Sequence, residues 1–498
     1  MTLLSRVLGL VRDVVIARYF GAGTGADAFF IAFKIPNFLR RLFAEGAFSQ
    51  AFVPVLSEYR TLKTEQETRA LVASVAGVLG MVLLVITLLA MLGAPALTFL
   101  FAPGFHDEPE KFQLASDMLR ITFPYLLLIS LTAFAGGILN SFGRFAVPAF
   151  TPVLLNLAMI FAAVVISPMF SEPVIALAWG VVLAGLLQLL FQLPFLLRMN
   201  LLPRPRLDYR HEGVQRILTL MVPALFGVSV SQINLLLDTV LASFLPTGSV
   251  SWLYYSDRLS ELPLGVFGIA IATVILPALS RKHAAQSKDD FAATLDWGLR
   301  AVLLIGVPAA LALFLLAEPL LITLFYYGEM TIRDVEMSAG SLRAYSAGLM
   351  AFMLIKILAP GYFSRQDTKT PVKIGVRAMG VNMVFNLILI WPLAHVGLAL
   401  ATSLSAWLNA FWLFRGLKKA EVFVPQAGWS RFVVQLIVAN TVLGGVVWFV
   451  ALSSLQWHEL SVLARGSYMF ATVVAGMAAY FAALYLSGVR LRHFMRRA

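Results

Sequence analysis

The sequence contains no cysteine, and few of its 498 residues are charged. Without cysteine the chain can form no disulfide, thiolate metal site or cysteine nucleophile, although this leaves the compartment undetermined. Charged residues make up 13% of the chain and apolar residues 60%, with a mean hydropathy of +0.84. The surface of a soluble protein needs about twice that charge. The composition therefore predicts a polytopic, multi-pass membrane protein.

Signals of nucleotide binding are missing as well. The sequence has no G-x-x-x-x-G-K-[ST] loop and not one Gly-Lys dipeptide, so we expect no phosphate-binding loop of that type. The longest soluble linker is too short to form a nucleotide-binding domain. A secondary transporter, not an enzyme, is therefore expected, with a separate ATPase partner as an open alternative.

Long apolar stretches predict an all-α fold of about fourteen transmembrane helices. The predicted spans lie near residues 1–20, 25–59, 70–102, 113–142, 146–168, 173–198, 214–245, 248–281, 291–325, 339–363, 371–393, 397–417, 431–453 and 464–488. Lysine and arginine gather in alternate loops, whereas the other loops have little beyond Lys111, Arg333 and Arg465. The positive-inside rule then predicts that both termini are cytoplasmic. The net charge of +12 reflects this topology, so no nucleic-acid partner is needed to explain it.

The chain also repeats itself. The segment AFVPVLSEYR around Pro54 recurs as VILPALSRKH around Pro277, and Pro148 recurs as Pro371. Echoes at a near-constant offset predict two homologous six-helix lobes, related by a pseudo-two-fold axis along the membrane normal. The predicted division is an N-lobe at 1–200 (helices 1–6), a cytoplasmic linker at 201–213, a C-lobe at 214–420 (helices 7–12), and helices 13 and 14 with a basic cytoplasmic tail at 421–498. Two lobes around a central site are typical of transporters that work by alternating access.

Charged residues inside the predicted spans crowd into residues 1–20, 25–60 and 248–282. A charge at bilayer depth costs about 3 kcal/mol or more, so it persists where it faces water, a partner or a ligand. Basic residues are in excess there: Arg6, Arg12, Arg18, Lys34, Arg40, Arg41 and Arg258 stand against Asp13, Asp27, Glu45, Asp257 and Glu261. Arginine stays charged and binds phosphate bidentately. The pattern predicts a cavity for an anionic substrate.

Helical geometry restricts which of these charges can meet. On a straight helix Arg6 and Asp13 lie on nearly one face, while Arg12 and Arg18 point about 120° to either side. They reach one cavity only if the helix bends, and Gly9 is the predicted place for an unwound or hinged turn. Snorkelling to the interface is the alternative for Arg18.

The second and eighth predicted helices carry spaced pairs. Arg41 and Glu45 are four residues apart and predict a structural ion pair, whereas Arg40 has no obvious partner on its own helix. Arg258 and Glu261 are three residues apart, so the acid is expected to hold the arginine in its rotamer.

Three long motifs carry a resemblance to a known family. They are SRVLGLVRDVVIARYFGAGTGADAFFIAFKIPNFLRRLFAEGAFSQAFVPVLSEY, SVSWLYYSDRLSELPLGVFGIAIATVILPALS and LAPGYFSRQDTKTPVKI. Through essentially the whole chain the sequence resembles the MurJ (MviN) family of lipid II flippases, in the multidrug/oligosaccharidyl-lipid/polysaccharide exporter superfamily. One departure is that four residues precede SRVLG here, whereas family members often have a dozen or so.

The resemblance implies a function in peptidoglycan biosynthesis, and hence in cell wall and cell shape. Such a protein flips lipid II from the cytoplasmic to the periplasmic leaflet of the bacterial inner membrane through a central cationic cavity. Its expected partners are lipid II, membrane lipids and cell-wall synthesis or division proteins. The alternatives are export of another lipid-linked oligosaccharide or of small drugs. By motif match, the substrate-binding residues are Arg6, Arg12, Asp27, Arg40, Ser251, Arg258 and Glu261.

Some members of the family hold a sodium ion, and no other cofactor is expected. The positions that match are Asp238, Asn382, Asn386 and Thr402. Oxygen ligands suit a hard cation, but one acidic ligand of the family is Asn386 here. The alternative is that Asp238 is a buried structural group. The membrane potential would then drive transport, at about 2.3 kcal/mol per charge per 100 mV.

We expect Asp238→Asn to abolish Na⁺ binding and weaken transport, because neutral oxygens alone seldom repay the dehydration of a small cation. Asn386→Asp should tighten the site by restoring an acid. Isothermal titration of the purified protein with NaCl against KCl checks both. A wild-type protein that gives no Na⁺-specific heat would leave Asp238 a structural group.

Overall fold

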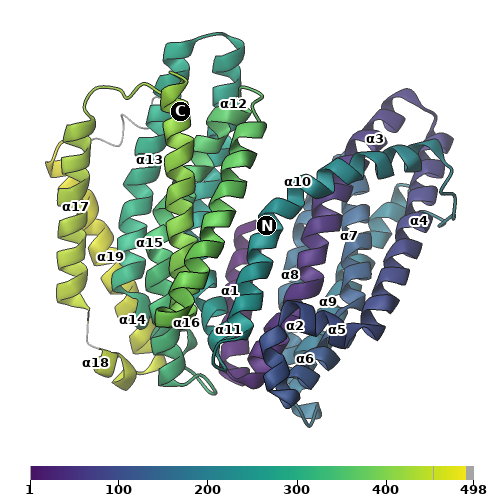
Figure 1. Cartoon of the computed structure of the whole chain (residues 1–498), viewed down its shortest axis with the longest axis horizontal. Coiled ribbons are helices and arrows are strands. Elements are labelled where there is room, and N and C mark those ends of the chain that lie inside the picture. Colours follow the sequence, from purple (N-terminus) through teal and green to yellow (C-terminus); the bar gives the residue numbers. More distant parts are fainter. Residues whose placement is uncertain (1, 452–453, 490–498) are drawn as a thin grey trace. The chain divides into compact units, whose positions relative to one another are not determined.

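The described part of the chain is helical throughout. The computed structural model describes residues 2–451 and 454–489, apart from the side chains of residues 2–3, 43–45, 226–231, 234–235, 269 and 454–455. These residues contain no strand. The elements (Figure 1) are α1 (Thr2–Phe20), α2 (Thr24–Arg40), η1 (Arg41–Phe48), α3 (Ser49–Leu62), α4 (Glu65–Leu92), α5 (Ala94–Phe101), η2 (Pro103–Asp107), α6 (Pro109–Thr122), α7 (Pro124–Ser141), α8 (Ala146–Phe161), η3 (Ala162–Ile166), η4 (Ser167–Met169), α9 (Ile175–Arg198), α10 (Glu212–Ser243), α11 (Ser249–Pro263), η5 (Leu264–Gly268), α12 (Ile269–Ala284), α13 (Lys288–Leu315), α14 (Ala317–Phe325), α15 (Ile332–Phe363), α16 (Lys369–Lys419), α17 (Trp429–Val450), α18 (Ser454–Glu459) and α19 (Val462–Leu486). The predicted basic tail beyond residue 489 lies outside the described residues.

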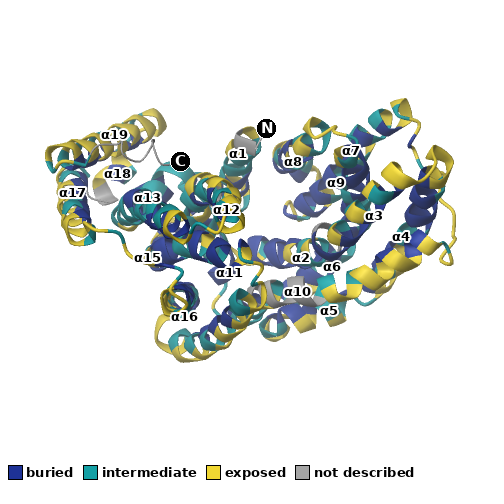
Figure 2. Cartoon of the chain, turned by 90° about the horizontal axis from the view of Figure 1, so that it is seen from above, coloured by how far each residue is buried: buried dark blue, intermediate teal, exposed yellow. Residues whose placement is uncertain are grey.

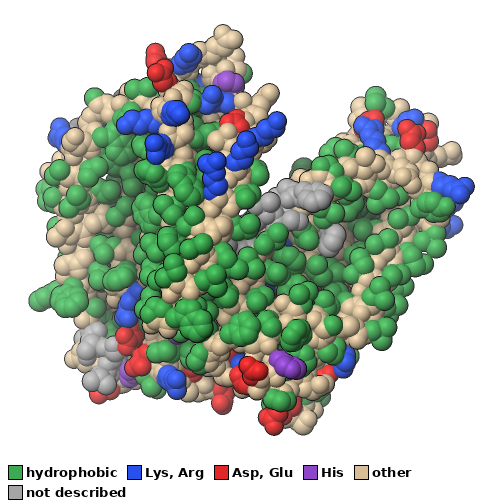
Figure 3. Space-filling model, in the orientation of Figure 1, with side chains coloured by type: hydrophobic (Ala, Val, Ile, Leu, Met, Phe, Trp, Pro, Cys, Tyr) green, Lys and Arg blue, Asp and Glu red, His purple; other side chains and the backbone are tan. Residues whose placement is uncertain are grey.

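The helices confirm the predicted all-α membrane fold. Within the described residues, 10 helices are long and apolar enough to cross a membrane. One of them, α16, is two helices merged across a kink at Ala394, whose φ of 48° is not helical. The other predicted spans fall on α1, on the run α2–η1–α3 and on α10. Hydrophobic side chains cover the lengths of the helices, and charged side chains gather toward their ends (Figure 3).

The helix boundaries confirm the internal repeat. Helix α13 begins and ends 223 residues after α4 (65 to 288, 92 to 315). The π-helical turns η1 and η5 begin at Arg41 and Leu264, which are again 223 residues apart (41 to 264). A π-helical turn inserts one residue into the helical ladder and commonly marks a functional segment. The same irregularity therefore interrupts the second and eighth predicted spans at equivalent positions.

The chain packs as two compact units. The first comprises residues 1–251 and 327–330, and the second comprises 252–326 and 331–498. This division follows contacts and not the repeat, since α10 packs with the first unit. The predicted lobe boundaries at 200 and 214 stay a prediction.

Each unit is held by close packing, because lipid tails give helices no hydrophobic reason to associate. In the first unit Phe52 is 0% exposed, with its ring centroid 5.1 Å from that of Phe48 and 5.0 Å from that of Phe134. Small residues let backbones approach: a Cβ on Gly180 of α9 would lie 2.5 Å from that of Ala162. Buried residues lie inside each group of helices, and exposed ones line the outer faces of helices such as α17 and α19 (Figure 2).

A buried carboxylate attaches the C-terminal helices to the rest of the second unit. Asp296 of α13 is 2% exposed and accepts hydrogen bonds from Trp429 Nε1 at 2.6 Å and from the Gln426 amide at 3.1 Å. Its other oxygen pairs with Arg300 Nε at 2.8 Å. The Arg300 guanidinium lies 4.9 Å from the centroid of the Trp429 ring. The start of α17 is thereby fixed on α13.

Asp296→Ala is expected to destabilise the protein by about 3–5 kcal/mol, because it leaves a partly buried Arg300 without its carboxylate. The control is Asp290→Ala on the same helix. Asp290 is 60% exposed beside Lys282, and exposed pairs contribute about 0–1 kcal/mol. Thermal unfolding in detergent measures both variants, and equal losses would contradict the anchoring role.

Candidate functional site

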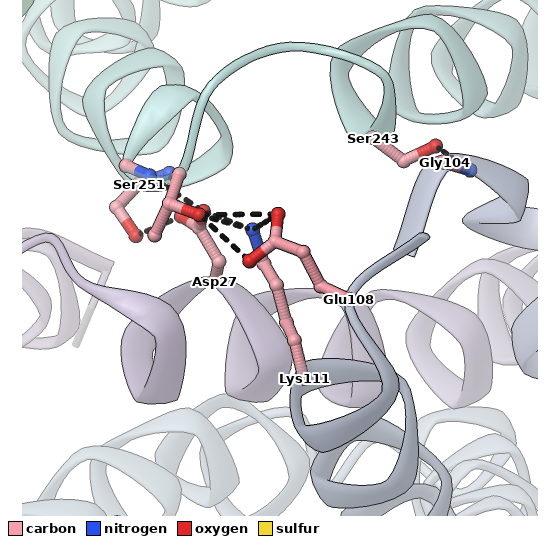
Figure 4. A network of polar contacts seen from close by, with 8 residues as sticks. Asp27, Gly104, Glu108, Lys111, Ser243 and Ser251 are labelled. Atoms are coloured by element: carbon pink, nitrogen blue, oxygen red, sulfur yellow. Dashed lines mark hydrogen bonds and ion pairs between the residues drawn. The ribbon is translucent and has the colours of Figure 1, made fainter. Parts of the chain in front are cut away.

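A buried carboxylate from the first predicted cavity region lies at the centre of a polar network. Asp27, near the start of α2, is 1% exposed. It accepts hydrogen bonds from the Gly248 amide at 2.7 Å, the Ser251 amide at 2.9 Å and Ser251 Oγ at 2.6 Å. The structure therefore brings together two of the residues that the sequence predicts for the site, Asp27 and Ser251 (Figure 4).

Lys111 supplies the countercharge for this carboxylate. Its side chain is 1% exposed, and Nζ lies 3.3 Å from Asp27 Oδ2. The same ammonium donates to Thr247 Oγ1 at 3.1 Å, lies 3.6 Å from Glu108 Oε1 and is 4.4 Å from the centroid of the Phe105 ring. We call Asp27, Lys111, Gly248 and Ser251 the outer network, because the topology predicted by the positive-inside rule puts these helix ends outside.

Local sequence explains how α11 meets Asp27. Gly248 has φ +99°, a conformation that glycine adopts without the penalty of a Cβ. The turn aims the first amides of α11 at the carboxylate, and the helix dipole favours an anion at that end. Nearby, the Gly104 amide donates to Ser243 Oγ at 3.1 Å, which joins η2 to the end of α10 (Figure 4).

Sequence reasoning missed Lys111. The sequence pattern indicates only a loop cation at this position, because its partner Asp27 is far away in sequence. The available signal was its position in the first turn of α6, three residues after Glu108, where an isolated cation faces an acidic loop. Depth of burial could not be deduced from that spacing.

In α1 the structure corrects the predicted unwound turn. The helix runs from Thr2 to Phe20 without interruption, so it does not unwind at Gly9. A Cβ on Gly9 would meet the Asn156 side chain of α8 at 3.8 Å, and this packing favours a continuous helix there. Asn156 Nδ2 also donates to the Ser5 carbonyl at 2.9 Å.

Arg12 is buried and held by two side chains. It is 8% exposed, and its Nε and Nη2 donate to Asp13 Oδ1 at 2.9 and 2.7 Å. Its Nη1 donates to Asn156 Oδ1 at 3.1 Å. Because neighbouring residues can meet through a long side chain, the roughly perpendicular directions of Arg12 and Asp13 do not keep them apart. Arg6 of the same helix is half-buried.

The other arginines also have protein partners. Arg40 Nε donates to Asn37 Oδ1 at 2.8 Å, which corrects the expectation that Arg40 lacks a partner on its own helix. In the second unit Arg258 Nη1 lies 3.1 Å from Glu261 Oε2, as the spacing predicts. The predicted partner of Arg41, Glu45, has its side chain outside the described residues. The substrate-binding role of all these residues stays a prediction.

The predicted sodium ligands are partly grouped. Asn382 is 1% exposed and Asn386 is 0% exposed. Ser405 Oγ donates to Asn382 Oδ1 at 3.3 Å and to the Thr402 carbonyl at 2.9 Å, so oxygens of both halves of α16 come together. This donor set fits a hard cation. Asp238 belongs to the other unit, so the complete site stays a prediction.

Comparisons with known proteins cover the whole chain. The family model described as "Lipid II flippase MurJ" matches residues 16–468. The chain is 52% identical to the probable lipid II flippase MurJ of Haemophilus influenzae over 100% of both chains. It is 54% identical to that of Vibrio cholerae, over 99% of this chain and 95% of the relative. A solved structure, "Lipid II flippase MurJ, inward closed conformation", superposes with a TM-score of 0.81 at 25% identity, covering 99% of this chain and 98% of the other.

Lys111→Met is expected to destabilise the first unit by about 3–5 kcal/mol, because it leaves Asp27 buried without its countercharge. Adding Asp27→Asn should recover much of the loss, since the double variant buries no charge. Glu108→Gln is the control, because Glu108 is 48% exposed and contributes about 0–1 kcal/mol. Thermal unfolding of the wild type and these three variants tests this; a double variant no more stable than Lys111→Met would rule out a coupled pair.

Proposed function

The chain belongs to the lipid II flippase MurJ family, and from that premise we propose that it moves lipid II from the cytoplasmic to the periplasmic leaflet of a bacterial inner membrane. The observation that carries this proposal is the likeness to lipid II flippases along essentially the full chain. The protein would act as a transporter without enzymatic chemistry, with both termini cytoplasmic. Cell-wall synthesis or division proteins are its proposed partners.

The substrate sets the physical problem. Lipid II joins a pyrophosphate and a sugar–peptide head to a hydrocarbon tail, and only the tail is soluble in the bilayer. Anionic oxygens crossing hydrocarbon lose their hydration, and fixed donors must replace that hydration. Guanidinium groups suit this purpose, because they stay charged and bind phosphate through two parallel hydrogen bonds.

The proposed donors are Arg6, Arg12, Arg40 and Arg258. A bare cation at this depth would be costly without substrate. Arg12 donates hydrogen bonds to Asp13 and Asn156, and Arg258 forms an ion pair with Glu261. We take these contacts as the resting partners, which a pyrophosphate or carboxylate of the substrate exchanges for its own oxygens.

Exposure suggests which exchange is easiest. The Arg258 side chain is 31% exposed and that of Glu261 is 51% exposed, so the protein encloses this pair only in part. The Arg12 side chain is 10% exposed and that of Asp13 is 3% exposed. We propose that Arg258 engages the substrate readily and that Arg12 engages it only after Asp13 has been displaced.

The outer network gives the proposed cycle its outer closure. Asp27, Lys111 and Ser251 are fully covered in the first unit, so this state keeps the outer helix ends together. Release of the substrate to the outside requires the network to open. Sodium or the membrane potential would then bias the cycle, as proposed from the sequence.

Arg12→Ala, Arg40→Ala and Arg258→Ala are each expected to lower flipping about tenfold to a hundredfold, because each removes a charge-assisted contact of about 1.5–3 kcal/mol. Arg→Lys should fail at one or more of these positions, since a point charge lacks the fork. The measurement is headgroup accessibility of lipid II in the outer leaflet after depletion of the wild-type protein, at matched protein levels.

The control is Arg216→Ala. Arg216 pairs with Glu58 at an exposed site, with side chains 49% and 41% exposed, and its loss should leave flipping near wild type. Normal headgroup exposure in all three arginine variants would disprove the cationic site. Export of a different lipid-linked oligosaccharide would show as normal lipid II exposure after depletion.

A further inference from the structure

A short segment of the second half of the chain packs as part of the first unit. Tyr327–Met330, which we call the strap, connects α14 to α15. These four residues belong to the first unit, although the residues on both sides of them belong to the second. The Glu329 amide donates to the Arg18 carbonyl in the last turn of α1 at 2.9 Å, and Met330 is 2% exposed. The strap is therefore bonded to the end of α1 through backbone atoms.

Two glycines with positive φ make this approach possible. Gly21, just after α1, has φ +59°, and Gly328 in the strap has φ +60°. A Cβ on Gly21 would lie 2.6 Å from the Glu329 carbonyl oxygen. A Cβ on Gly328 would overlap the Arg18 carbonyl oxygen. Because both obstacles are backbone atoms, no rotamer change relieves them, and each glycine satisfies a conformational and a steric requirement at once.

We infer that Gly21 and Gly328 are positioning residues for transport: they form a backbone clasp that holds the strap on the outer end of α1 and opens when the outer side opens. This inference rests on the alternating access proposed above. Because each end of the strap continues into the second unit, any rearrangement of that unit pulls on the clasp. The clasp has a backbone hydrogen bond and close backbone contact, without a buried charge, so it can break and re-form in each cycle.

The clasp and the outer network secure the same turn. Residues 21–23 connect α1 to α2, and Asp27 lies in the first turns of α2. The clasp contacts the first residue of this turn, and the network contacts the helix just after the turn. We infer that loss of the clasp exposes this end of the first unit to water even while Asp27 keeps its partners.

The test uses the natural absence of cysteine. Met330→Cys places a buried reporter in the strap, and a membrane-impermeant thiol reagent is applied from outside. In this background Gly328→Ala is expected to raise the labelling rate at least about tenfold, because the clasp no longer closes, and to impair flipping. Gly21→Ala should reproduce both effects. The double variant should exceed neither single variant by much, since both changes break one contact.

The matched control is Gly143→Ala. Gly143 has φ +76° and a Cβ there would meet nothing within 4 Å, so it imposes the same backbone strain without an overlap. Labelling in Gly328→Ala no faster than in Gly143→Ala would overturn the clasp. Faster labelling with unimpaired flipping would overturn its role in transport.

Labelling needs no lipid II, so it separates this inference from the proposed substrate. If the flipping assay fails for the wild type but labelling rises, the clasp stands and the substrate assignment falls. If the Gly328→Ala protein does not accumulate, the labelling rate and flipping of the Gly21→Ala protein test the clasp in its place. Amide exchange of the wild type is a further check: Glu329 should exchange slowly, and exchange as fast as in an unprotected loop would refute the clasp.

Discussion

The buried carboxylate of Asp27 is the constraint on which the first unit depends. A carboxylate that is 1% exposed in a spanning helix is stable only if its oxygens accept hydrogen bonds and its charge is neutralised. Lys111 neutralises the charge. Two amides and a hydroxyl at the α10–α11 turn donate hydrogen bonds to the carboxylate oxygens. Elements α2, α6 and α11 are therefore fixed together by one side chain. If these helices separate, water hydrates the charges of Asp27 and Lys111. The outer network can therefore open and close without leaving a buried charge unpaired.

The same reasoning explains why the arginines are paired. An anion-binding cavity must stay folded between substrates, and bare guanidinium groups at membrane depth would oppose that. Arg12, Arg40 and Arg258 each have a protein acceptor in the structure. If these arginines bind the substrate as proposed, such acceptors lower the affinity for it, because the substrate must displace them. They also let it leave, and a transporter needs release as much as binding.

Periodicity and repeats made much of the fold predictable. Apolar stretches predicted the helices. The recurrence of Pro54 as Pro277 predicted equivalent segments, and the boundaries of α4 and α13 repeat at the same offset. The spacing of Arg258 and Glu261 predicted their ion pair. Local spacing could not reveal Lys111 beside Asp27, because that contact depends on packing between distant helices. It also misjudged Gly9, since glycine permits a break but the neighbouring helix decides whether one occurs.

Equivalent positions of the repeat carry opposite charges. Lys111 and Asp334 occupy the third position of α6 and α15, helices that begin 223 residues apart (109 to 332). In the first unit Lys111 neutralises Asp27, which binds Ser251. In the second unit Asp334 accepts a hydrogen bond from the indole of Trp252 at 2.8 Å. Ser251 and Trp252 are consecutive, so α11 is bonded to a different unit on each side of one peptide bond. Adjacent residues of α11 thus contact two different carboxylates, and Arg258 follows Ser251 by two turns on the same helix.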